Sequence, residues 1–359
     1  MVYTLTPGPV PLHEDTLKAM SKQIISHRSE SFRVLLASVR SRLQEIYDST
    51  PLVLTGSGTL AVESMAWSLV EPGEKVLVVS HGEFGERLSS TLQRRGAIVK
   101  EVTPATPGSP VRIEEVEEEI EKGNHTVLAT VFTETSLGLS FRDVERIGEK
   151  AKERGMLVIV DAVSALGGEN IPPPDVIDAL ATASQKALAG PPGLSFVFVN
   201  EEAKKKLASL KTKPPSYLDL YKVLRYHEER RETPYTPAIN LLYAMNIALE
   251  LIIEYGVDEW VERHCKRAQL LHDRLPAQGY KPVVQEERYR ACTLAAFYTP
   301  LSSSKIVEKA LAHGYHIARG MGELRDRVIR VSTMGWLNDS IYLELVDVLA
   351  SILNHNNQS

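Results

Sequence analysis

One lysine of this 359-residue chain stands in a segment of small, uncharged residues. In "DALATASQKALAGPPG" no acidic residue lies within seven positions of Lys186 on either side. Lysine side chains usually lie on solvated faces, and burial lowers their pKa because it disfavours the charged ammonium. A neutral amine is a nucleophile toward carbonyl groups. The segment therefore predicts a buried lysine that reacts with a carbonyl compound.

A carboxylate stands 25 residues earlier, after the apolar run of "MLVIVDAVSALGG". Asp161 ends this expected strand, where burial raises the pKa of a carboxyl group unless a cationic partner keeps it ionised. The alternative is an aspartate that only caps the following turn. Its position makes Asp161 a candidate partner for a cationic group of a ligand.

Three small residues follow another apolar run, "PLVLTG", and open a helical pattern. Ser57, Gly58 and Thr59 would place hydroxyls and free backbone amides at a helix N-terminus, which is a ready site for an anion. The alternative is an ordinary Ser/Thr N-cap. The spacing matches neither a Walker loop nor the GxGxxG of a dinucleotide site.

Two more strand ends carry side chains that suit a planar ligand. Phe84 lies between two glycines in "HGEFGERL", where it either covers a ring or anchors a loop. Ser136 follows the strand in "TVFTETSLG", where its hydroxyl either donates to a ligand or stabilises a turn. Together with the anion site, Asp161 and Lys186, these positions describe a phosphorylated, planar pyridinium aldehyde.

The elements that would position these residues alternate between strands and helices. Short apolar runs predict strands at 51–56, 75–80, 97–102, 125–132, 156–162 and 194–199, with a further strand-like segment at 177–184. Helical patterns lie between most of them, at 59–70, 85–96, 112–123 and 141–155. This order predicts a mainly parallel sheet with helices on both faces, and ligands bind beyond the carboxyl ends of such strands.

The rest of the chain has a different pattern. Residues 201–260 are punctuated by proline and tyrosine and lead into a helix at 241–256. Strand-like segments follow at 292–300, 316–320 and 327–335, with helical segments between and after them. We expect an N-terminal segment of residues 1–20 that lines the active site, a large domain of residues 21–255 and a small α+β domain of residues 256–359.

Composition excludes several classes of protein. A hydrophobic content of 43% and a charged content of 24% are those of a globular protein, and the net charge of −5 offers no general attraction to nucleic acid or to an anionic membrane. Cys265 and Cys292 are too few for a disulfide framework, so we expect free, inert thiols, and no cluster suggests a metal. Without a signal-peptide pattern or a bilayer-length apolar run, we expect the cytoplasm.

Several motifs together resemble a known family. The segments "TPGPVPL", "TGSGTLAVES", "HGEFGERL", "TETSLG", "VDAVSALGG", "SQKALAGPPGLSF" and "RVIRVSTMG" resemble class V pyridoxal-phosphate aminotransferases of fold type I. The resemblance covers residues 4–350 and favours the alanine–glyoxylate/serine–pyruvate branch, with 2-aminoethylphosphonate–pyruvate aminotransferase as a near relative. It implies an α/β fold, in which a large domain with a mainly parallel seven-stranded sheet precedes a smaller α+β C-terminal domain.

The resemblance also implies a role for each candidate residue. Pyridoxal 5'-phosphate would be the cofactor, held by Lys186 as a Schiff base, and the released lysine would move the proton of the substrate. Asp161 would pair with the protonated ring nitrogen, and Phe84 would stack on the ring. The remaining cofactor contacts would be Ser57, Gly58, Thr59 and Gln185 at the phosphate and Ser136 near the ring.

Other implied residues concern the substrate and a second subunit. Arg330 would bind the substrate α-carboxylate through two parallel hydrogen bonds, and Gly8 would bring backbone close to the ligand. Thr233 and Thr236 have the spacing of a segment that contacts the phosphate of the neighbouring subunit, although the family pattern begins with tyrosine. We therefore expect a homodimer whose active site lies at the subunit interface.

The resemblance implies transamination from alanine or serine to glyoxylate or pyruvate. An aspartate donor would need another cation, which His27 or Arg28 would supply if they are more than a solvated helix end. A 2-aminoethylphosphonate donor is a further alternative. A cysteine desulfurase is disfavoured because neither cysteine lies in an expected mobile loop, and a non-catalytic binding module is disfavoured because Lys186 and Asp161 are both present.

Overall fold

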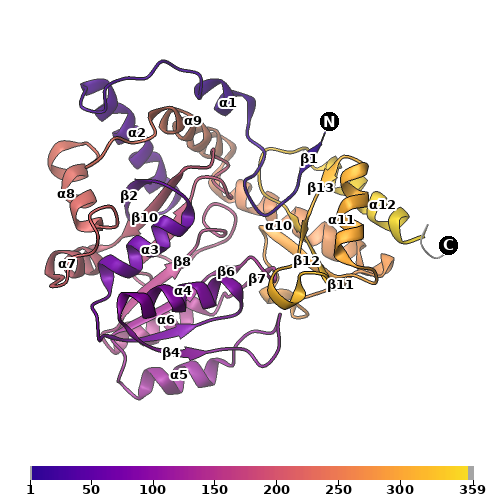
Figure 1. Ribbon diagram of the computed structural model, residues 1–359, viewed down its shortest axis with the longest axis horizontal. Helices are drawn as coiled ribbons and strands as arrows, with labels where there is room; N and C mark the ends of the chain where they lie inside the picture. Colours follow the sequence, from indigo (N-terminus) through magenta and orange to yellow (C-terminus); the bar gives the residue numbers. More distant parts are fainter. Residues whose placement is uncertain (1, 355–359) are drawn as a thin grey trace.

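A seven-stranded sheet forms the centre of the computed structural model, which describes residues 2–354 (Figure 1). Its strands lie in the order β2, β10, β9, β8, β5, β3, β4. Strands β3, β4, β5, β8 and β9 run parallel to their neighbours in that group, and β10 is antiparallel to both β2 and β9. The mainly parallel seven-stranded sheet expected from the sequence is thus confirmed. The bounds are β2 Thr50–Thr55, β3 Lys75–Val79, β4 Ile98–Val102, β5 Val127–Val131, β8 Leu157–Asp161, β9 Ala179–Ala183 and β10 Leu194–Val199.

Helices cover both faces of this sheet because successive strand residues point to opposite sides. In β3, Leu77 and Val79 join one apolar cluster, whereas Val76 and Val78 join another. The first cluster includes residues of α2 (Glu30–Ile46), α5 (Ile113–Glu121), α6 (Val144–Glu153) and α9 (Ile239–Tyr255). The second includes residues of α3 (Gly58–Leu69), α4 (Glu83–Arg95), α7 (Glu201–Ser209) and α8 (Leu220–Arg230). The short helix α1 (Glu14–Ala19) packs against α9.

A second, antiparallel sheet lies to the right in Figure 1, in the orange and yellow part of the chain. Its strands are ordered β11, β12, β15, β14, and residues of α10, α11 and α12 share its apolar cluster. The N-terminal strand β1 pairs in parallel with β13, so the start of the chain lies against this part of the molecule. The bounds are β1 Tyr3–Thr4, α10 Val257–Arg274, β11 Lys281–Pro282, β12 Leu294–Tyr298, α11 Ser303–Ala312, β13 Tyr315–His316, β14 Ala318–Arg319, β15 Val328–Ser332 and α12 Ser340–Asn354.

Two features of the large sheet region were missing from the sequence interpretation. Helices α7 and α8 occupy the segment that was read only as punctuated by proline and tyrosine. The side chain of Asp219 caps α8 by accepting the amide of Lys222, a local signal that the chain does carry. A short hairpin of β6 (Thr133–Glu134) and β7 (Leu139–Ser140) follows β5 and turns near the strand ends.

The expectation of free thiols is wrong, because Cys265 and Cys292 form a disulfide. Cys265 lies on α10, and Cys292 lies just before β12, 27 positions later in the chain. Helix α10 packs along β12, and the chain returns through β11 so that the two side chains meet. Two cysteines at this separation carry no pairing signal in the sequence. The disulfide also removes one of the grounds on which we expected a reducing compartment.

Within the described residues, no single helix has the length and apolar character needed to cross a bilayer. One sharply bent pair of helices, Ile239–Tyr255 with Val257–Gln278, has that length and composition when taken together.

Candidate active site

A cavity of about 180 Å³ lies where the carboxyl ends of the parallel strands meet. Side chains from separate elements converge on it because parallel strands all end at the same edge of the sheet. The lining residues that the sequence had singled out are Ser57, Gly58, Thr59, Phe84, Asp161, Gln185 and Lys186. Further lining residues that the sequence interpretation missed include Arg87, Thr133, Thr135 and Ser164.

One end of the cavity is built for an anion. Ser57 occupies the N-cap position of α3, yet its side chain makes no capping hydrogen bond, so the hydroxyl remains available. A Cβ on Gly58 would lie 2.8 Å from Val163 and 3.1 Å from Ala183, which explains why this position has no side chain. The Oε1 atom of Gln185 is buried and has no hydrogen-bond partner among residues 2–354. The Ser57 hydroxyl and the free backbone amides at this helix N-terminus fit a phosphate, and the NH2 group of the Gln185 amide is a further donor.

Asp161 closes β8 with a buried carboxyl group that is 7% exposed. Its Oδ1 atom accepts the backbone amide of Val163 at 2.9 Å. Burial, together with the charge of Glu134, raises the pKa of this carboxyl group to about 6, against the opposing effects of the Val163 amide and the charges of Lys186 and Arg87. A cationic partner would therefore be needed to hold Asp161 fully ionised, and a protonated pyridine nitrogen is such a partner.

Lys186 follows β9 and is partly buried, facing both the cavity and the N-terminal segment. Burial lowers the pKa of its ammonium group to about 8, the charge of Arg330 lowers it as well, and Asp161 opposes them. The Nζ atom donates to the carbonyl oxygen of Pro7. A Cβ on Gly8, whose φ is +101°, would lie 2.8 Å from the Lys186 Cδ atom. Backbone of the N-terminal segment therefore lies directly against the lysine.

Arg330 lies on β15 in the second sheet and reaches toward the hairpin of the large sheet region. Its Nε atom donates to the carbonyl of Arg319 at 2.8 Å, and its Nη1 atom donates to the carbonyl of Thr135 at 3.0 Å. Within the described part of the chain its Nη2 atom has no acceptor, which leaves one edge free for a carboxylate. Burial lowers the pKa of this guanidinium to about 10, and Glu134 opposes that shift.

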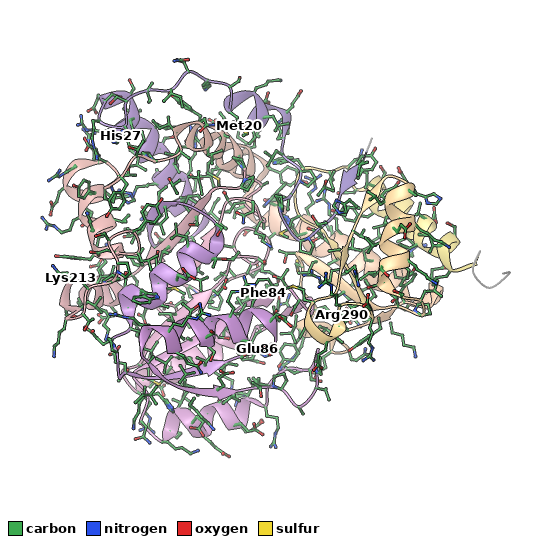
Figure 2. All side chains as sticks on the ribbon, viewed as in Figure 1. Met20, His27, Phe84, Glu86, Lys213 and Arg290 are labelled. Carbon is green, nitrogen blue, oxygen red and sulfur yellow. A yellow bond between two sulfur atoms is a disulfide. The ribbon has the colours of Figure 1, made fainter. Side chains whose placement is uncertain are left out.

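The residues expected around the ring do not all lie where the resemblance implied. Phe84 stands at the start of α4, near the junction between the two sheet regions in Figure 2. Ser136 instead lines a neighbouring cavity of about 310 Å³, and its hydroxyl donates to Glu134. Thr135, one position earlier, lines the cavity of about 180 Å³ that also contains Lys186, which we call the cofactor cavity, and donates to the hydroxyl of Ser164 at 2.7 Å.

Two expected segments lie outside this cavity. Thr233 and Thr236 line a separate hollow beside Tyr217 and Tyr235. Arg28 donates to the Glu232 carboxylate at 2.6 Å and to the Thr233 carbonyl at 2.8 Å, so its charge is already paired. Figure 2 shows His27 at the opposite end of the large sheet region from Phe84, so it lies away from the cavity at Lys186 of its own chain.

Comparisons with known proteins agree with this arrangement. The family model described as "Aminotransferase class-V" matches residues 12–323. An uncharacterized aminotransferase of Methanocaldococcus jannaschii is 33% identical over 92% of this chain and 87% of its own length. Alanine–glyoxylate aminotransferase of a Nostoc species has a TM-score of 0.92 at 32% identity, over 98% of this chain and 95% of that one. Aspartate aminotransferase of Thermus thermophilus has a TM-score of 0.89 at 32% identity, over 98% and 99%.

The fold and the strand-end cavity are thus those of a pyridoxal-phosphate-dependent transaminase of fold type I. The chain belongs to the class V aminotransferase family. It moves an amino group between an amino acid and a 2-oxo acid. Bound pyridoxal 5'-phosphate supplies the electron sink that stabilises negative charge at the substrate Cα. The residues described above fit this cofactor, since they offer an anion site, an aromatic side chain, a buried carboxylate and a lysine.

Proposed function

We propose that the enzyme transfers the amino group of a small, uncharged amino acid, alanine or serine, to glyoxylate or pyruvate. The observation that carries this proposal is the cavity of about 310 Å³ beside Ser136. Three carboxylates line it, those of Glu83, Glu86 and Glu323, and among the described residues that line it there is no lysine or arginine. His81 lines it too, but burial lowers the pKa of this imidazole to about 4, so it is neutral.

The charge of this cavity supports an uncharged donor over the alternative donors. The side-chain carboxylate of aspartate or the phosphonate of 2-aminoethylphosphonate would meet carboxylates of the same sign, which disfavours binding. Alanine and serine bring no such charge, and serine adds a hydroxyl that suits a polar lining. The Nostoc relative named above is an alanine–glyoxylate enzyme, whereas the Thermus relative is an aspartate enzyme.

The proposed roles of the residues follow from their positions. Lys186 holds the cofactor covalently and, once displaced, carries the proton that leaves the substrate Cα. Asp161 keeps the ring nitrogen protonated, and Phe84 covers the ring. Ser57, Gly58, Thr59 and Gln185 bind the phosphate, Arg330 binds the α-carboxylate and Gly8 closes the pocket above Lys186. For Ser136 we propose a contact at the substrate side of the ring, through the cavity that it lines.

A half-reaction screen tests the donor. Each amino acid is added alone to the aldehyde form of the enzyme, and loss of the aldehyde absorbance is followed. We expect alanine and serine to react and aspartate and 2-aminoethylphosphonate to react at least tenfold more slowly. A variant with Glu83→Gln, Glu86→Gln and Glu323→Gln should gain reaction with aspartate and keep that with alanine. Inert alanine and serine with reactive aspartate would overturn the proposed donor.

We also propose that the active site is completed in a homodimer, by Thr233 and Thr236 of the neighbouring subunit. The hollow that contains them is separate from the cavity at Lys186 in the same chain. Glu232 accepts from both Arg28 and Arg33 at 2.6 Å, which fixes the segment just before Thr233. Mixed dimers of Lys186→Ala and Thr233→Ala/Thr236→Ala chains provide the test. Each parent should be impaired, and the mixture should recover activity in one of its two sites.

No recovery in those mixed dimers, or a monomer by light scattering at full activity, would contradict shared sites.

For the single chain we propose three parts, which are an N-terminal segment of residues 1–20, a large domain of residues 21–255 and a small domain of residues 256–359. Residue 1 and residues 355–359 lie outside the described residues. The seven-stranded sheet falls within the second part and the four-stranded sheet within the third. Limited proteolysis should cut first near residue 256 if this division holds.

We further propose that the enzyme acts in the cytoplasm, which the composition supports. Disulfides persist mainly in oxidising compartments, and intracellular proteins of hyperthermophiles are the known exception. Cell fractionation tests the compartment, and alkylation of thiols before lysis tests the redox state of Cys265 and Cys292 there. Recovery of the enzyme outside the cytoplasmic fraction would contradict this proposal.

A further inference from the structure

We propose that Glu134 is a positioning residue that holds Phe84 and Ser136 in place beside the cofactor cavity. The inference rests on the proposed role of Phe84 as the cover of the cofactor ring. Glu134 itself lines neither of the two cavities described above, so it acts through its neighbours. Its side chain has 0% exposure, which is unusual for a glutamate and requires compensation by partners.

The partners of Glu134 come from two different elements. One oxygen, Oε2, accepts the backbone amides of Phe84 and Gly85 at 3.1 Å each. The other, Oε1, accepts the backbone amide of Ser136 at 3.2 Å and the hydroxyl of the same residue. The carboxylate therefore joins the first turn of α4 to the loop of the β6–β7 hairpin. These two segments carry the residues proposed to contact the ring and the substrate.

The hydrogen bonds favour the ionised form of Glu134. Three N–H groups and one O–H group point at its two oxygens, and only an ionised carboxylate offers acceptors without a competing donor. A negative charge is further favoured at the N-terminus of a helix, here that of α4. Burial raises the pKa of Glu134, and all four donors oppose this shift. The cluster is therefore built around a charged acceptor.

The backbone around Glu134 is closely packed. A Cβ on Gly82 would lie 2.9 Å from the Ser136 hydroxyl and 3.2 Å from the Glu134 Cδ atom. A Cβ on Gly85 would lie 2.8 Å from the backbone of Ser80. The turn before Phe84 can thus approach the hairpin only because residue 82 is glycine, and α4 can begin against Ser80 only because residue 85 is glycine. A rearrangement of Glu134 should move Phe84 and not be absorbed locally.

The test uses Glu134→Gln, which keeps the size of the side chain but turns one acceptor into a donor that faces N–H groups. In the cofactor-free protein, hydrogen exchange of the Phe84, Gly85 and Ser136 amides should accelerate at least tenfold. In the loaded enzyme, the visible circular dichroism of the cofactor should change, and kcat for alanine should fall about tenfold with a smaller change in KM. Glu134→Asp serves in the same measurements if the glutamine variant does not fold.

Glu169→Gln is the matched control. Glu169 is also buried and lines neither of the two cavities, and its carboxylate accepts the Cys292 amide, the Ser140 hydroxyl and the Arg142 guanidinium. This control should lose stability without changing the circular dichroism of the cofactor. Combining Glu134→Gln with Phe84→Ala should cost less kcat than the product of the two separate losses, because part of the effect of Glu134→Gln acts through Phe84.

Three results would overturn the positioning role. They are unchanged exchange at the Phe84 and Gly85 amides, an unchanged cofactor spectrum, and independent losses that multiply in the double variant. Failure of the proposed function would appear differently, as a wild-type enzyme that is inert toward alanine and serine while its amides still respond to Glu134→Gln.

Discussion

Replacing Asp161 by asparagine should make the cofactor-free enzyme more stable while it destroys catalysis. The carboxyl group is 7% exposed, and in the absence of a cofactor no cation lies in hydrogen-bonding contact with it among the described residues. Asparagine has the same shape and keeps an oxygen that accepts the Val163 amide. The substitution therefore removes a buried charge and little else.

The magnitude follows from the pKa of this group. Burial raises the pKa of Asp161 from 3.8 to about 6, so the folded chain holds a proton that the unfolded chain has released. Stability is therefore lost as the pH rises from about 4 to about 6, and the full loss persists at higher pH. A difference of about two pKa units corresponds to about 3 kcal/mol. At pH 7.5 the asparagine variant should gain up to that amount, or about 4 °C in Tm.

The assay is thermal unfolding of both cofactor-free proteins at pH 3.5 and at pH 7.5. We expect nearly equal melting temperatures at the low pH, where the aspartate is mostly protonated in both states, and a more stable variant at the high pH. The loaded variant should lose about a hundredfold or more in kcat, since the ring nitrogen has lost its partner. A variant that is less stable at pH 7.5, or that keeps wild-type kcat, would refute the proposed electrostatics of this site.

Three further substitutions test other parts of the account. Arg330→Lys should raise KM about tenfold for every α-carboxylate substrate. Arg327→Lys, at an exposed position, should leave KM unchanged. Equal KM values for the two variants would remove Arg330 from the substrate site. Gly8→Ala places a Cβ against Lys186 and should slow attachment of the cofactor. Gly73 also has a positive φ, +84°, but no described atom lies within 4 Å of its Cβ position, so Gly73→Ala should not slow attachment. Equal rates of attachment in the two variants would contradict the close approach of Gly8 to Lys186. The double variant Cys265→Ser/Cys292→Ser loses the disulfide, and its free energy of unfolding should be lower by about 3.5 kcal/mol, given the sequence separation of 27. Unfolding in denaturant measures this difference, and an unchanged free energy of unfolding would argue against the bond.

Much of the candidate site follows from the sequence because of one topological rule. Residues that follow parallel strands meet at one edge of the sheet, so Ser57, Phe84, Asp161 and Lys186 come together although they are far apart in the chain. Their chemistry could then be read from residue type alone. The alternation of strands and helices was equally accessible, since apolar runs of five or six residues form strands that are buried on both faces.

Other features depend on contacts that no local pattern records. Glu134 accepts amides that lie 49 and 50 positions earlier in the chain, and its neighbours in sequence give no sign of this. Thr135, and not Ser136, lines the cavity at Lys186 because of how the β6–β7 hairpin turns. Residue types alone do not specify that turn. The disulfide depends on the packing of α10 along β12. Arg87 carried a usable signal, because it lies one helical turn after Phe84 on the same face of α4.

The most direct test of the account is to locate the lysine that carries the cofactor. The loaded enzyme is treated with borohydride, digested and analysed by mass spectrometry, with Lys186→Ala treated in parallel. We predict one cofactor per chain on the peptide that contains Lys186, and a variant that neither fixes the cofactor nor transfers an amino group. Fixation on another lysine, or transamination at the wild-type rate by Lys186→Ala, would contradict the central claim.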